Sequence, residues 1–194
     1  MIKFKEILEN KILVPRKLDT RKEDQKRVTL QKIQQYIKNG SKGDLDLSNT
    51  PITSLPNNLK VGGNLFLGNT PITSLPNNLK VGGNLDLSSS KITSLPNNLE
   101  VGGSLGLSNT PITSLPDNLK VGENLYLANN KITSLPNNLE VGGSLGLSNT
   151  PITSLPDNLT VGGFLGLSNT PISKKYSKEE IKKMVPGIKG VISI

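Results

Sequence analysis

The feature that most constrains this sequence is a repeat of twenty residues that runs through its middle with constant spacing. The pattern Leu-x-Leu first occurs at Leu45 and Leu47 and returns every twenty residues until Leu165 and Leu167, which makes seven copies. A fixed period of about 20 to 50 residues is the signature of a solenoid. One copy is too short to bury a core alone, so we expect successive coils to stack on one another.

The residue types within one copy predict the path of a coil. Leu65 and Leu67 alternate with residues expected to face outward, which indicates a short strand of a parallel sheet. Gly62 and Gly63 give the backbone freedom to turn into this strand, and Pro71 ends it because proline lacks a donor N–H. The later Leu-Pro-Asn-Asn segment favours turns over a full helix. The side chains expected inside this coil are Val61, Leu65, Leu67, Ile72, Leu75 and Leu79.

The spacing Leu-x-Leu-x-x-(Thr/Asn)-x-Ile-x-x-Leu-Pro resembles the leucine-rich repeat, and its length is similar to the short bacterial class. The segment SNTPITSLPDNLTVGG is also similar to leucine-rich-repeat proteins of tailed bacteriophages. The resemblance covers residues 43–172. It implies an α/β solenoid with a parallel β-sheet on one face, an extended or 3-10 convex side, and protein recognition as its role. A parallel β-helix is the alternative fold, since its coils have nearly this length.

Two polar columns are candidates for the ladder that joins the coils. The family usually places there an Asn whose side chain bonds backbone groups of adjacent coils, whereas this chain has mostly Thr, beginning with Thr50. A second column, mostly of Asn, lies one residue earlier and begins at Asn49. The sequence leaves open which of the two forms the ladder.

Charge divides the chain into three parts. The net charge is +7 over residues 1–42, −3 over 43–172 and +4 over 173–194, within a total of +8. We expect a helical N-terminal cap, seven leucine-rich repeats and a C-terminal cap in these three ranges. The terminal coils of a solenoid need such covers.

Two capping boxes predict helices in the caps. Thr20 with Glu23 begins a helix expected over residues 21–38, and Ser177 with Glu180 begins a second one that Pro186 ends. The apolar stripe expected on the first helix is Val28, Leu30, Ile33 and Ile37. Residues 188–194 repeat the pattern of 161–167, which predicts an eighth strand. Residues 2–9 form a short amphipathic pattern that loosely resembles leader peptides of internal proteins of T-even-type phages.

The composition excludes several classes of chemistry. The chain has no Cys, His or Trp, which removes disulfides, Cys/His zinc sites and imidazole bases. Asp46 and Asp86 are two coils apart, about 10 Å, which is too far to share one ion. We therefore expect no metal and no cofactor. No run of eighteen apolar residues and no signal peptide occur. We therefore expect a cytoplasmic protein, located in the host-cell cytoplasm or in the virion if a phage encodes it. We also expect a monomer.

The outward strand positions form a surface that no core requirement dictates. Aromatic side chains placed there are candidate anchors for a partner. The residues that we expect to bind a partner are Asp46, Phe66, Asp86, Tyr126 and Phe164. The predicted function is a non-enzymatic scaffold that binds a protein through this strand face. Two alternatives stay open, a virion-associated or packaged phage protein and a nucleic-acid binder that uses the basic ends.

Overall fold

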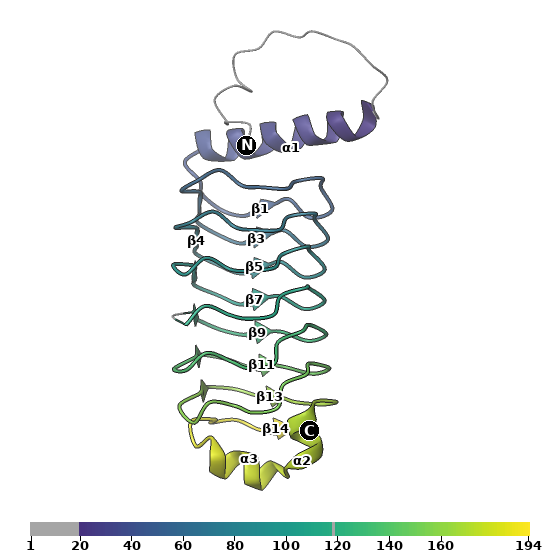
Figure 1. The fold of residues 1–194 in the computed structure, drawn as a ribbon. Coiled ribbons are helices and arrows are strands. Elements are labelled where there is room, and N and C mark those ends of the chain that lie inside the picture. The colour runs from purple at the N-terminus through teal and green to yellow at the C-terminus, as the bar shows by residue number, and fades with distance from the viewer. Residues whose placement is uncertain (1–19, 118) are drawn as a thin grey trace.

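The computed structural model describes residues 20–117 and 119–194. These residues form a long stack of coils with a helix at one end and two short helices at the other (Figure 1). The first helix is α1 (Thr20–Lys38), and the last two are α2 (Pro171–Lys175) and α3 (Lys178–Met184). The amphipathic pattern at residues 2–9 and the side chain of Thr20 lie outside the described part of the chain.

One wall of the stack is an eight-stranded parallel sheet. Each coil contributes a strand of two residues. Leu45 pairs with Leu65, and the same spacing of twenty residues joins each strand to the next as far as Leu165. The last step pairs Leu165 with Ile192, which confirms the predicted eighth strand. In spatial order the strands are β1 (Leu45–Asp46), β3 (Leu65–Phe66), β5 (Leu85–Asp86), β7 (Leu105–Gly106), β9 (Leu125–Tyr126), β11 (Leu145–Gly146), β13 (Leu165–Gly166) and β14 (Ile192–Ser193).

A second parallel sheet, which the sequence analysis did not foresee, runs along another wall. It is built from the two residues just before Gly62 and its counterparts in the later coils, so that Val61 pairs with Val81 and points into the core. Each coil is therefore held to its neighbours along two lines. The six strands are β2 (Lys60–Val61), β4 (Lys80–Val81), β6 (Glu100–Val101), β8 (Lys120–Val121), β10 (Glu140–Val141) and β12 (Thr160–Val161).

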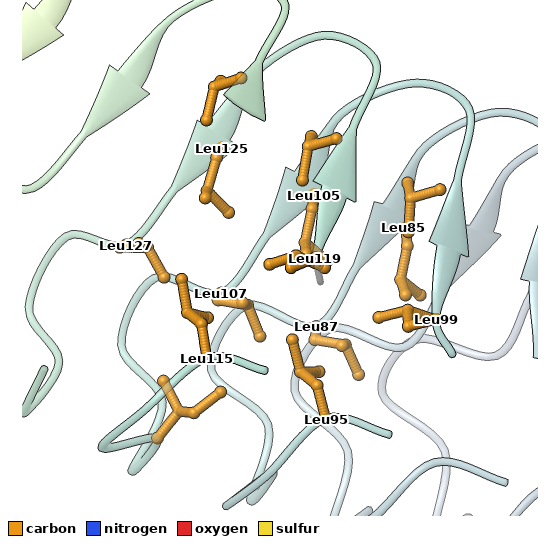
Figure 2. Packing of buried hydrophobic residues seen from close by; sticks show 14 of the residues in the cluster. Leu85, Leu87, Leu95, Leu99, Leu105, Leu107, Leu115, Leu119, Leu125 and Leu127 are labelled. Atoms are coloured by element: carbon orange, nitrogen blue, oxygen red, sulfur yellow. The ribbon is translucent and has the colours of Figure 1, made fainter. Parts of the chain in front are cut away.

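The core is the column of aliphatic side chains that fills the interior of the stack. Leucines from the strand and from the return arc point into the same space, as Leu85 and Leu95 do (Figure 2). In the repeats, every predicted inward side chain is buried except Leu155, which is half-buried. Before the last coil, whose return contains α2 and α3, the return arcs have no helix among the described residues and turn at their Asn residues, with Asn58 in the left-handed region at φ 61°. This confirms the extended convex side.

Helix α1 covers the first coil with only part of the apolar stripe predicted from the sequence. Ile33 is 1% exposed, and Leu30 and Tyr36 pack against the core from the same side. Val28 and Ile37, predicted to belong to the stripe, are 59% and 44% exposed. Val28 lies about 140° around the helix from Ile33, so an apolar residue there faces away from the coils.

The C-terminal end has one more helix than predicted. Ser177 caps α3 by accepting the N–H of Glu180, whose carboxylate accepts the N–H of Ser177, which confirms the predicted capping box. Thr170 caps the additional helix α2 through a reciprocal pair with Ser173. Within the part of the chain that the structure describes, no helix is both long and apolar enough to span a bilayer.

Candidate functional site

All five predicted binding residues lie on the outward side of the eight-stranded sheet, which we call the strand face. Asp46, Phe66, Asp86 and Tyr126 occupy equivalent positions on β1, β3, β5 and β9. Phe164 stands immediately before β13. Because the inward leucines alternate with these positions, the strand pleat itself turns the five side chains outward. The structure thus gathers on one face residues that span more than a hundred positions of sequence.

Phe66 and Asp86 are direct partners on neighbouring strands. Both side chains are half-buried, and the strands that carry them lie about 4.8 Å apart. The Oδ1 atom of Asp86 accepts the backbone N–H of Ser88 at 2.9 Å. A β-carbon added at Gly106 would lie 2.9 Å from Oδ1 of Asp86, and one at Gly68 would lie 3.2 Å from its Oδ2. Gly68 and Gly106 therefore add no side chain that would cover this carboxylate.

Tyr126 and Phe164 are the most exposed aromatic side chains described, at 47% and 44%. The ring of Phe164 lies over Gly166, and a β-carbon added at Gly166 would be 2.9 Å from Cε1 of Phe164. Gly166 is buried. Tyr126 stands beside Gly146 at a looser 3.8 Å. The later coils thus expose two aromatic rings, each of which lies next to a glycine of the strand face.

Asp46 sits next to helix α1 and differs from Asp86 in having a basic neighbour. Its Oδ1 accepts the N–H of Ser48 at 2.9 Å, and the Lys32 ammonium donates to its backbone carbonyl oxygen. The hydrogen bonds from the Ser48 backbone and hydroxyl, followed by the Lys32 charge, hold the pKa of the Asp46 carboxyl below its ordinary value. Asp46 is therefore ionised at neutral pH, with part of its charge balanced within the chain.

A third polar column, at outward positions just before the strands, forms the continuous ladder between coils. Oδ1 of Asn64 accepts the backbone N–H of Asn84 at 2.7 Å, and Oδ1 of Asn84 accepts the N–H of Ser104 at 2.7 Å. The acceptors in this column are Asp44, Asn64, Asn84, Ser104, Asn124 and Ser144. Phe164 takes the next place, and its ring offers no acceptor to continue the series.

The two columns considered from the sequence have other roles. The Thr hydroxyls bond within their own coil, as Thr70 does by donating to the carbonyl of Leu67 at 2.7 Å. The Asn column adopts the left-handed region, with Asn69 at φ 55°, a conformation that Asn tolerates better than most residues. Its side chains join coils at two described places, from Asn69 to Asn49 and from Asn169 to Asn149.

A groove of about 830 Å³ follows the six-stranded sheet beside the end of α1. Its floor is valine and glycine, and Lys60, Lys80, Glu100 and Lys120 line its side. Lys80 and Glu100 form an exposed ion pair at 2.7 Å, the kind that contributes about 0–1 kcal/mol. Among residues 20–117 and 119–194, no group of three or more His, Cys, Asp or Glu side chains is placed to hold a metal ion.

Comparisons with known proteins bear on the fold alone. No protein-family model matches the chain, and no curated protein matches it. Among solved structures, it is similar to the leucine-rich-repeat domain of a Shigella effector, with a TM-score of 0.52 and 16% identity. That likeness covers 88% of this chain and 90% of the other.

Proposed function

The chain has the fold of a leucine-rich-repeat protein, as the spacing predicted, and on this premise we propose that it is a non-enzymatic scaffold that binds a protein partner. The partner contacts the strand face. This sheet is a row of short parallel strands with a constant spacing, so it offers a stiff surface that loses little conformational freedom on binding.

The observation that carries the proposal is the variation of one outward column within nearly identical coils. The inward positions repeat Leu from coil to coil, whereas the outward strand position changes between acidic, aromatic and glycine residues. Neither the core nor the ladder requires these choices. On the same face, Tyr126 is 47% exposed and Phe164 is 44% exposed. Exposed aromatic side chains of this kind serve as anchors in protein interfaces.

Affinity capture from the source cells tests the proposal. The wild-type chain and a variant with Phe66→Ala, Asp86→Ala and Tyr126→Ala serve as parallel baits. We expect the variant to melt within a few degrees of the wild type and to lose the captured protein. A matched bait with Lys60→Ala and Lys120→Ala removes side chains from the groove instead. Capture that the groove variant loses and the strand-face variant keeps would contradict the proposal.

A further inference from the structure

We infer that the partner inserts an arginine side chain between Phe66 and Asp86, and that an apolar part of the same segment contacts Tyr126. This inference rests on the proposed function and names the chemistry that the strand face recognises. Its basis is the pairing of the Phe66 ring with the Asp86 carboxylate on adjacent strands. Among the described residues of the strand face, this is the one ring and carboxylate pair whose carboxylate has no basic neighbour.

The charged residues in the two outward columns of the strand face are all acidic, although the whole chain is basic. The chain has a net charge of +8, yet the outward strand column and the ladder column hold no basic residue. Their charged members in the described range are Asp44, Asp46 and Asp86. Within these two columns, a docking segment therefore meets carboxylates on the first coils and uncharged side chains on the later ones.

Asp86 is the carboxylate in this set best placed for an external cation. Asp44 uses Oδ1 to accept the N–H of Asn64 at 2.7 Å as a member of the ladder, and Asp46 lies beside Lys32. Within the described ranges no basic side chain forms an ion pair with Asp86. Its Oδ1 accepts one backbone N–H, which leaves Oδ2 and the remaining lone pairs free for a donor from outside.

The neighbouring ring makes arginine the fitting cation. A guanidinium group stacks on an aromatic face and donates two parallel hydrogen bonds to a carboxylate at the same time. Phe66 supplies the ring on the strand next to Asp86. Gly106, on the far side of Asp86, adds no side chain that would block the approach. An ammonium group has the charge for this site but not the planar shape.

The apolar half of the contact lies two strands further along. Tyr126 stands on β9, and only Gly106 on β7 lies between it and Asp86 in the outward column. The separation is therefore about 10 Å. An extended segment covers this distance in about three residues. The preferred partner sequence thus has an arginine and, about three residues before or after it, an apolar or aromatic residue.

A random-peptide display library supplies a defined probe. Peptides are selected on the folded wild-type chain, and synthetic copies are measured by fluorescence anisotropy. We expect the selected peptides to contain arginine and to bind Asp86→Asn about tenfold more weakly than the wild type. Their affinity should also fall several-fold for Phe66→Leu. Replacing the peptide's arginine by lysine should lower its affinity for the wild type to a similar degree. Asp86→Asn keeps the side-chain oxygen that accepts the Ser88 N–H. Asp157→Asn, which removes an exposed carboxylate from the return arc, is the matched control and leaves binding unchanged.

The outcomes separate this inference from the proposed function. Peptides that lose affinity for Tyr126→Ala but lack a basic residue, or that bind Asp86→Asn as well as wild type, overturn the arginine site and leave strand-face binding standing. Peptides that bind every strand-face variant equally overturn both. A selection that enriches no binder also overturns the inference, because an open ring and carboxylate pair should select arginine.

Discussion

Single glycines decide how closely successive coils approach. The column that begins with Gly82 and Gly102 lies just after the second sheet, and an added β-carbon at each position would overlap the carbonyl oxygen of the glycine one coil earlier. None of these residues has a positive φ. Close approach, and not backbone conformation, is therefore what requires glycine here.

Gly122→Ala tests this requirement against a glycine on the strand face. We expect Gly122→Ala to lower the free energy of unfolding by about 2–3 kcal/mol or more, because its β-carbon would displace the backbone of the coil carrying Gly102. Gly146→Ala meets its nearest atom, Cδ1 of Tyr126, at 3.8 Å, so its effect stays within about 0.5 kcal/mol. Urea unfolding measures both. Equal losses for the two variants would contradict the account.

The ladder column gives a second prediction at the level of one side chain. Asn84→Ala removes the Oδ1 atom that accepts the N–H of Ser104 at 2.7 Å, and we expect a loss of about 1 kcal/mol in the free energy of unfolding. Asn84→Asp keeps an acceptor of the kind that Asp44 provides in the first coil. Urea unfolding at neutral pH should therefore show the aspartate variant closer to wild type. A neutral effect of Asn84→Ala would remove the ladder from the list of stabilising contacts.

Among the elements, α1 has the clearest single task, which is to cover the first coil. Ile33 reaches the core, and the hydroxyl of Tyr36 is within hydrogen-bonding distance of the carbonyl oxygens of Ser41, at 2.9 Å, and Gly43, at 2.8 Å. The same hydroxyl accepts the N–H of Gly62 at 3.3 Å. The helix thus satisfies polar groups of the first turns as well as burying their apolar side.

Ile33→Ala and Val28→Ala form a matched pair for this element. We expect Ile33→Ala to cost about 2–4 kcal/mol, because its side chain is 1% exposed, and Val28→Ala to stay within about 0.5 kcal/mol, because its side chain is 59% exposed. Thermal and urea unfolding report the stability, and amide exchange of Leu45 and Leu65 reports fraying of the first strands. A larger loss from Val28→Ala would mean that α1 packs against the coils with the side that carries Val28.

The elements show where sequence patterns predict structure and where they do not. The inward leucines were predictable because burial allows only aliphatic residues at a fixed period. The second sheet was not, since a strand of two residues such as Lys60–Val61 is too short to show alternation. The ladder was missed for a related reason: Asn84 was assigned to the solvent by its outward direction, but its short amide reaches the next coil's backbone.

At the scale of the whole molecule, the residues proposed to bind a partner are largely separate from those that hold the coils together. The leucine core, the glycine column and the ladder hold the coils at a fixed spacing, and the strand face keeps side chains that these contacts do not need. Sequence alone located the five candidate residues on this face. It did not predict that Phe66 and Asp86 would form an open pair while Asp46 has Lys32 beside it, because the position of α1 depends on tertiary packing.

Hydroxyl-radical footprinting of the chain, alone and bound to the captured partner, tests the central claim most directly. Oxidation reports the exposure of Phe66, Tyr126 and Phe164 on the strand face, and of Met184, 39% exposed in α3, as an internal reference. The account predicts that binding protects Tyr126 and Phe66 and leaves Met184 unchanged. Protection of Met184 with undiminished oxidation of Tyr126 and Phe66 would contradict it.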